Sequence, residues 1–127
     1  MRGGTSKALM FHLRDLPADR SEWDGLFLTA MGSPDPHGRQ LNGMGGGVSS
    51  LSKVCVLGPP TRPDADLNYT FAQILVFESR VDYSGNCGNM SSAVGPFAVE
   101  EGLVPAGDGE RVVRIHNTNT RDRKSVV

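Results

Sequence analysis

The chain is poor in cysteine and aromatic residues, carries almost no net charge and has no long apolar run. Its 13 Lys and Arg residues nearly balance 14 Asp and Glu residues, for a net charge of -1 with neutral histidines. We therefore expect no nucleic-acid or membrane partner bound through bulk charge. No apolar stretch approaches the roughly 20 residues of a membrane span, and the polar start is unlike a signal peptide. These absences predict a cytoplasmic protein whose two cysteines are reduced.

Glycine, in contrast, is abundant. The 16 glycines in 127 residues are about one residue in eight, against a usual content of ~7%, so turns and loops should be frequent. A chain of this length is one domain that can bury roughly two-thirds of its unfolded surface without a metal or a disulfide. The three histidines show no metal-ligand spacing, and we predict no metal site.

Apolar periodicity places the main elements. The spacing of Trp23, Leu26, Phe27 and Ala30 predicts an amphipathic helix. A second helix carries few charges before Glu100, so we expect it to be buried at the centre of the domain. Helices and strands do not alternate strictly, which favours an α+β fold. The predicted elements are strands over residues 8–13, 54–57, 69–77 and 111–116, helices over 19–30 and from about 88 to 102, and a loose charged tail over 121–127.

Cys87 immediately precedes the second predicted helix. Unpaired backbone N–H groups and the positive end of the helix dipole would favour a reactive thiolate there. The same N–H groups could bind the carboxylate of a ligand. A plain glycine–asparagine turn that happens to contain a cysteine is the alternative. Cys55 lies in an apolar run and is predicted to fill space in the core.

Two further segments could carry chemistry. Lys53 stands where a glycine- and serine-rich segment meets an apolar strand, and a lysine held against apolar neighbours can act as a base near neutral pH. A solvated lysine at a strand edge is the alternative. Residues 2–7 combine glycines, hydroxyls and cations, a set that binds carboxylates or phosphates. A frayed N-terminus is the alternative there.

Four segments, taken in order, resemble the PrpF family. They are Arg2-Gly3-Gly4-Thr5-Ser6-Lys7, residues 31–36 with 39–47, Ser49-Ser50-Leu51-Ser52-Lys53 and Ser84-Gly85-Asn86-Cys87-Gly88-Asn89-Met90-Ser91-Ser92. The family holds 2-methylaconitate isomerases, aconitate isomerases and 4-oxalomesaconate tautomerases. The resemblance implies a diaminopimelate-epimerase-like fold, in which a mixed sheet wraps around a central helix and the active site lies between two similar domains. One departure is Ala8, where relatives usually have glycine.

The resemblance also implies roles for individual residues. Lys53 and Cys87 match the catalytic lysine and cysteine of an isomerase that shifts a proton and a double bond on an unsaturated tricarboxylate. This chemistry is acid–base catalysis and needs no cofactor. The residues expected to bind the substrate are Gly3, Gly4, Thr5, Ser6, Ser52, Asn86, Gly88 and Asn89.

The resemblance covers about residues 1 to 120, where relatives continue into a second domain. We therefore expect residues 1–120 to be an amino-terminal domain whose partner is a missing second domain or a second copy in a homodimer. Two alternatives stay open. One is a non-catalytic carboxylate-binding remnant, whose exposed apolar face would drive self-association. The other is a two-base amino-acid racemase or epimerase on the same fold.

Overall fold

A computed structural model describes residues 1–105, 112–121 and 123–126 of the chain. Within these ranges, seven strands form one mixed sheet, in agreement with the α+β prediction. The strands are β1 (Arg2–Gly3), β2 (Ser6–His12), β3 (Lys53–Gly58), β4 (Leu67–Ile74), β5 (Val81–Asp82), β6 (Val113–Asn117) and β7 (Arg123–Val126). Their order is β1-β2-β3-β4-β6-β7, and β5 also pairs with β4. The β2–β3 and β4–β6 pairs are parallel, and the others are antiparallel.

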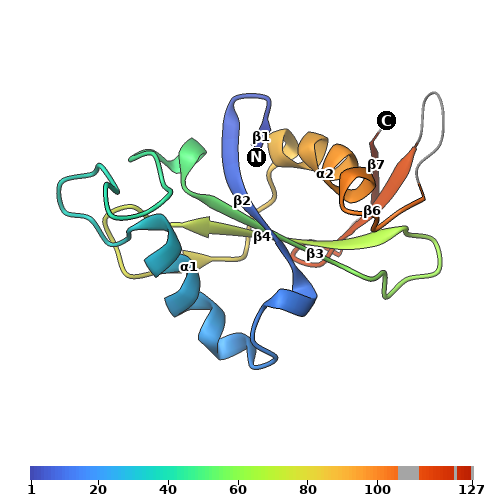
Figure 1. The fold of residues 1–127 in the computed structure, drawn as a ribbon, viewed down its shortest axis with the longest axis horizontal. Coiled ribbons are helices and arrows are strands. Elements are labelled where there is room, and N and C mark those ends of the chain that lie inside the picture. The colour runs from blue at the N-terminus through green and yellow to red at the C-terminus, as the bar shows by residue number, and fades with distance from the viewer. Residues whose placement is uncertain (106–111, 122, 127) are drawn as a thin grey trace.

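Two α-helices, α1 (Trp23–Met31) and α2 (Gly88–Glu100), lie on opposite faces of this sheet (Figure 1). Side chains alternate between the faces along a strand. On β3, Val54 and Val56 therefore join the core under α1, whereas Cys55 and Leu57 join the core under α2. By the same alternation Lys53 faces α2. Three short 3-10 helices, η1 (Leu13–Asp15), η2 (Arg20–Glu22) and η3 (Ser49–Leu51), lie between these elements.

Helix α1 buries part of the predicted apolar face, since Leu26 is exposed, and it starts later than predicted. Trp23, Phe27 and Met31 are its buried residues. The chain before it forms η2, where the Asp19 side chain accepts a hydrogen bond from a backbone N–H. Gly32 ends the helix in the left-handed conformation, with φ of 79°, which glycine adopts without strain. The predicted 19–30 helix is thus a 3-10 turn followed by nine helical residues.

Helix α2 is amphipathic, which corrects the prediction that it is buried on every side. Its buried face, which includes Met90, Ala93, Val94 and Ala98, packs on the sheet. The opposite face is exposed at Asn89, Ser92, Pro96 and Glu100. The described strands therefore cover one side of the helix. Pro96 lies inside the helix on its exposed side, and the helix continues past it to Glu100.

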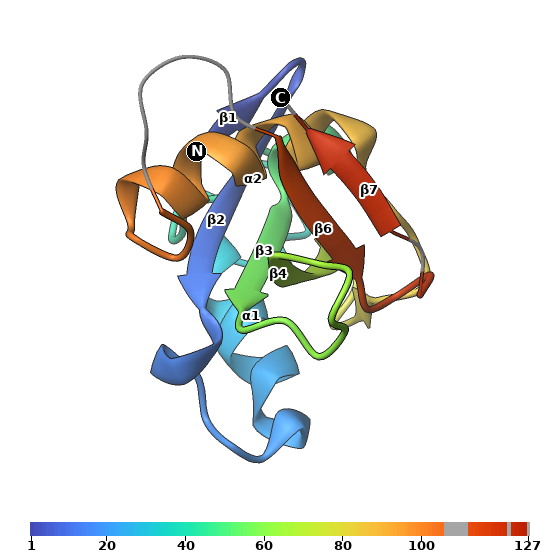
Figure 2. The same ribbon diagram turned by 90° about the vertical axis from the view of Figure 1, so that its right-hand side faces the viewer.

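The carboxyl-terminal segment is a strand and not a loose tail. β7 pairs with β6 in antiparallel register at the edge of the sheet (Figure 2). Residues 122 and 127 of the predicted tail, and residue 111 of the predicted 111–116 strand, lie outside the described residues. The predicted 69–77 strand is found as β4, from Leu67 to Ile74.

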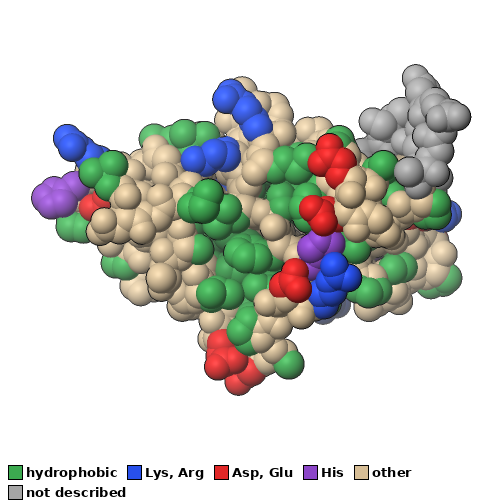
Figure 3. Space-filling model, viewed as in Figure 1, with side chains coloured by type: hydrophobic (Ala, Val, Ile, Leu, Met, Phe, Trp, Pro, Cys, Tyr) green, Lys and Arg blue, Asp and Glu red, His purple; other side chains and the backbone are tan. Residues whose placement is uncertain are grey.

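The charged side chains on the visible surface and the described helices bear on two absences predicted from the sequence, a patch of one charge sign and a membrane span. Acidic and basic side chains are spread over the face shown in Figure 3 and are not gathered in one patch of single sign. Among the described residues, no helix is both long enough and apolar enough to cross a bilayer.

Candidate active site

The amino-terminal segment forms a hairpin, and it is not frayed. β1 and β2 pair through Arg2 with Lys7 and Gly3 with Ser6. The α-amino group of Met1 donates a hydrogen bond to the Ala8 carbonyl oxygen at 2.6 Å. This pairing holds the hairpin turn, which contains Gly4 and Thr5, in place.

The hairpin touches the start of α2 at two glycines. A β-carbon on Gly3 would collide with the backbone carbonyl of Asn89. Gly4 has φ of 54°, and a β-carbon there would meet the Asn89 side chain at 2.6 Å. The side-chain amide of Asn89 donates to Thr5 Oγ1 at 2.9 Å and to Ser6 Oγ at 3.4 Å. Glycine is thus required where the turn approaches the helix.

Lys53 and Cys87, 34 positions apart in the sequence, meet on the α2 side of the sheet. The distance from Lys53 Nζ to Cys87 Sγ is 3.5 Å. Cys87 Sγ also lies 3.8 Å from Ser6 Oγ. The amine is 5.2 Å from the centre of the Phe71 ring, a cation–π contact that restrains it. The Lys53 amine at the start of β3 and the Cys87 thiol at the N-cap of α2 therefore face one another, and each can donate or accept a proton.

The first turn of α2 adds donors for an anion. Cys87 is the N-cap residue, and its side chain does not cap the helix. The N–H groups of the first helical residues have no partner within the helix, and together with the helix dipole they favour a negatively charged group. A β-carbon at Gly88 would have no atom within 4 Å. The space over the helix start is therefore open to a ligand.

Asn86 is held by a residue that the sequence analysis missed. Asn117, with only 1% of its surface exposed, donates from its side-chain amide to Asn86 Oδ1 at 2.8 Å. Asn117 Oδ1 accepts from the backbone N–H groups of Asn119 and Thr120. Because the bond from Asn117 occupies the side-chain oxygen of Asn86, its side-chain nitrogen Nδ2 is left to donate to a ligand. The run of polar residues at the end of β6 was the available signal.

The Ser52 hydroxyl, which the resemblance assigns to substrate binding, is bonded inside the core. Its side chain is fully buried, donates to the Ile74 carbonyl oxygen at 2.8 Å and accepts from Gln40 Nε2 at 2.8 Å. A hydroxyl with both roles filled inside the core cannot reach a substrate. It fixes the chain just before Lys53 instead. Of the other predicted residues, Ser6 contacts Cys87, and Asn86 and Gly88 flank it in the sequence. Gly3, Gly4 and Thr5 adjoin Asn89 in the first turn of α2.

The loop between α1 and β3 is organised by two polar side chains. The Asp35 carboxylate accepts from the backbone N–H groups of His37, Arg39 and Gln40, and these bonds hold the pKa of Asp35 below its ordinary value. Gln40 is 1% exposed. Its amide group donates to Ser33 and Ser52 and accepts from the Gly47 N–H.

Cys55 has the core role predicted for it. It is 0% exposed and lies 3.8 Å from the Tyr69 hydroxyl. Burial raises the pKa of the Cys55 thiol to about 12. Both cysteines are free thiols. Within the described ranges, no group of three His, Cys, Asp or Glu side chains converges as a metal site requires.

Fold and site together define an α+β domain with a thiol–amine pair at a helix N-terminus, and sequence comparison identifies its family. The family model described as PrpF protein matches residues 1–126. The chain belongs to the PrpF family.

Individual relatives support this membership. "Putative isomerase YraM" of Bacillus subtilis is 52% identical, over 94% of this chain and 32% of its own length. "3-Methylitaconate isomerase" of Eubacterium barkeri is 49% identical, over 94% of this chain and 31% of its own. The crystal structure of a methylitaconate-delta-isomerase superposes with a TM-score of 0.91 at 48% identity, covering 96% of this chain and 31% of that one. The chain thus spans about a third of the length of these relatives.

Proposed function

We propose that this chain is the domain of an isomerase that shifts a proton, and with it a double bond, on an unsaturated tricarboxylate of the aconitate type. The observation that carries the proposal is the 3.5 Å approach of Lys53 Nζ to Cys87 Sγ beside the start of α2. Relatives are named for isomerisation of 3-methylitaconate and 2-methyl-aconitate and for tautomerisation of 4-oxalomesaconate. These names supply the substrate class.

The reaction needs two proton transfers, and the pair provides two groups for them. One of Lys53 and Cys87 removes an allylic proton next to a carboxylate. The electron pair spreads over the double bond and that carboxylate. Proton delivery to the far carbon moves the double bond, and rotation in the anion before this step changes its geometry. General acid–base catalysis is sufficient, so the proposal includes no cofactor.

Preorganised donors would stabilise the anion formed in between. The backbone N–H groups at the start of α2 and the hydroxyls of Thr5 and Ser6 lie beside the pair. Each donor aimed at a developing negative charge typically lowers the activation barrier by about 3 kcal/mol. The Asn86 amide and the open space at Gly88 suit a second carboxylate of the substrate. Several carboxylates on one substrate match several donor groups at one site.

We further propose the diaminopimelate-epimerase-like arrangement for the whole enzyme, with this domain forming one wall of the site. The chain spans about a third of its relatives, so the opposite wall comes from the remaining length or from a second copy. In this arrangement the start of α2, where the space at Gly88 is open, faces the opposite wall.

Substrate binding is tested on the chain itself. Iodoacetamide labelling of Cys87 is followed with and without trans-aconitate, with acetate as the control anion. We expect trans-aconitate to slow the labelling of Cys87. Acetate, at a concentration that supplies the same number of carboxylate groups, should not slow it. Equal labelling rates in all three conditions would contradict binding at this site.

Turnover is tested in a chimera, in which residues 1–120 replace the matching third of the Eubacterium barkeri 3-methylitaconate isomerase. The chimera should isomerise its substrate and, in heavy water, incorporate deuterium. Lys53→Ala and Cys87→Ser should each abolish both signals. The matched controls Lys7→Ala, on the other face of β2, and Cys55→Ala, in the core, should keep them.

The outcomes separate the alternatives. A folded chimera without activity would favour the carboxylate-binding remnant. Deuterium exchange into an amino acid, with none into the unsaturated acid, would favour the racemase. Turnover that survives both site substitutions would remove the catalytic assignment.

A further inference from the structure

We propose that Lys53 and Cys87 form an oxidative cross-link site, at which hydrogen peroxide joins the lysine nitrogen covalently to the cysteine sulfur. The two atoms are 3.5 Å apart and come from different elements, β3 and α2. A bond between them requires an approach of less than 2 Å, on the order of a side-chain rotamer adjustment. The inference rests on this geometry alone and does not need the isomerase assignment.

The sulfur at position 87 is placed to be oxidised. Its neighbours are the Lys53 amine and the N–H groups at the start of α2. Peroxide attacks the thiolate form of a cysteine. The side chain is 7% exposed. A molecule as small as peroxide needs no more than such an opening.

The usual partner for an oxidised cysteine is a second thiol, and this chain provides a poor one. Cys55 is its one other cysteine, and it is fully buried against Tyr69. Burial raises the pKa of the Cys55 thiol to about 12, so it remains protonated and weakly nucleophilic. The Lys53 amine is held beside Cys87 by its contact with the Phe71 ring. The amine, 3.5 Å from the sulfur, is therefore the better nucleophile for it.

The chemistry balances in two steps. The Cys87 thiolate attacks one peroxide oxygen, the O–O bond breaks, and hydroxide leaves to give a sulfenic acid. The neutral Lys53 amine then attacks the sulfur, and the S–O bond breaks as water leaves, taking up the proton released by nitrogen. Overall, one thiol, one amine and one peroxide give one S–N bond and two waters. The chain loses two hydrogens.

Reduction reverses the bond. A dithiol such as dithiothreitol attacks the sulfur, the S–N bond breaks with its electrons on nitrogen, and nitrogen takes a proton. The second thiol of the reagent then releases Cys87 by forming the reagent's own disulfide. While the bond exists, neither Lys53 nor Cys87 can move a proton. The pair would thus act as a reversible redox switch.

The test uses the Cys55→Ala variant of the full chain, because its one remaining cysteine cannot form a disulfide within the chain. After treatment with peroxide, the intact mass should fall by two hydrogens. Tandem mass spectrometry should find residues 53 and 87 in one joined peptide, and dithiothreitol should separate them. A joined peptide with one extra oxygen, from a second peroxide inserting oxygen between nitrogen and sulfur with loss of water, also supports the site.

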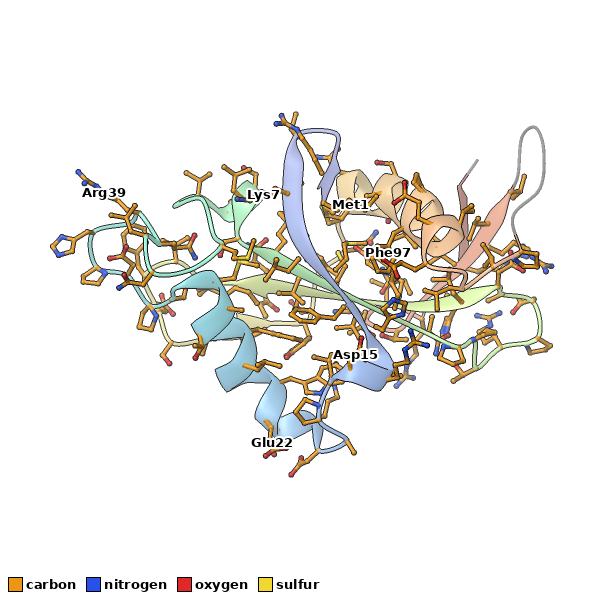
Figure 4. The ribbon with its side chains drawn as sticks, in the orientation of Figure 1. Met1, Lys7, Asp15, Glu22, Arg39 and Phe97 are labelled. Carbon is orange, nitrogen blue, oxygen red and sulfur yellow. The ribbon has the colours of Figure 1, made fainter. Side chains whose placement is uncertain are left out.

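A matched pair of lysine variants controls the experiment. Lys53→Arg keeps the charge and removes the nucleophilic amine, so Cys87 should gain oxygen atoms without a joined peptide. Lys7, labelled in Figure 4, lies near Met31 and Met44, on the face of β2 away from Cys87. The Lys7→Arg variant should therefore form the 53–87 cross-link as the chain that keeps Lys7 does. The wild-type chain is analysed in parallel, so that the test stays decisive if the Cys55→Ala variant does not fold. Oxygen addition to Cys87 without a joined peptide, or a 55–87 disulfide in the wild type, would overturn the proposal.

Discussion

Replacing Gln40 with methionine tests whether one buried amide holds the loop between α1 and β3 and, through Ser52, the start of β3. Methionine keeps the length of the side chain and removes its polar atoms. Three hydrogen bonds are lost, at 2.8 Å to Ser33 Oγ, 2.8 Å to Ser52 Oγ and 2.9 Å from the Gly47 N–H. The Ser52 hydroxyl keeps its bond to the Ile74 carbonyl oxygen.

The expected cost follows from these three bonds. Each contributes about 1 kcal/mol net, so the free energy of unfolding should fall by about 3 kcal/mol. For a chain of this size that corresponds to a decrease in Tm of about 10 °C. The substitution should also raise the labelling rate of Cys87, because the chain next to Lys53 loosens.

Urea unfolding followed by tryptophan fluorescence measures the change, since Trp23 is the single tryptophan. The matched control is Arg39→Met, which alters the exposed neighbour in the same loop and should change stability by less than about 0.5 kcal/mol. A loss below about 1 kcal/mol for Gln40→Met, or equal losses for the two variants, would refute the reasoning.

Three further predictions concern other parts of the domain. Iodoacetamide should label Cys87 much faster than Cys55, because the Cys55 thiol is buried and its pKa is raised to about 12; peptide mapping at neutral pH decides, and equal rates would be contrary to the structure. Gly3→Ala should lower stability by about 1–3 kcal/mol, since its methyl would overlap the backbone of α2, and a neutral effect on Tm would argue against the tight contact. The pKa of Asp35 is held below 3.8, chiefly by the His37 N–H, so its contribution is present above that pH and is lost as the pH falls through the folded pKa. Asp35→Asn should accordingly lose less stability than wild type between about pH 6 and about pH 3, and parallel losses would exclude the effect.

The sequence predicted those elements that bury a regular apolar pattern. The spacing of Trp23, Leu26, Phe27 and Ala30 identified α1, although Leu26 is exposed and Met31 is buried instead. The apolar run of β3 identified that strand. The pattern could not show that residues before Trp23 form a 3-10 turn, because that turn is set by a polar cap at Asp19. β7 was missed because it is a polar edge strand, whose pairing with β6 depends on backbone groups that periodicity does not report.

The site residues that could be predicted are those whose role shows in the neighbouring sequence. Cys87 before a helix and Lys53 at the start of a strand could each be picked out, and the resemblance to the PrpF family joined them. The roles of Ser52, Gln40 and Asn117 were not predictable, because a buried polar side chain is defined by partners far away in the sequence. A serine beside a catalytic candidate looks the same whether it points into the core or toward a ligand.

Asn119 completes the sheet where β4 lacks a neighbouring strand. One edge of β4 pairs with β6 near its start and with β5 near its end. Between them, the Asn119 side chain accepts from the Phe71 N–H at 2.9 Å and donates to the Phe71 carbonyl oxygen at 2.7 Å. A primary amide thus stands in for a peptide unit and satisfies both backbone groups of Phe71, the kind of exposed edge that other strands can pair with. An aspartate, which cannot donate when ionised, could not replace Asn119 in this role.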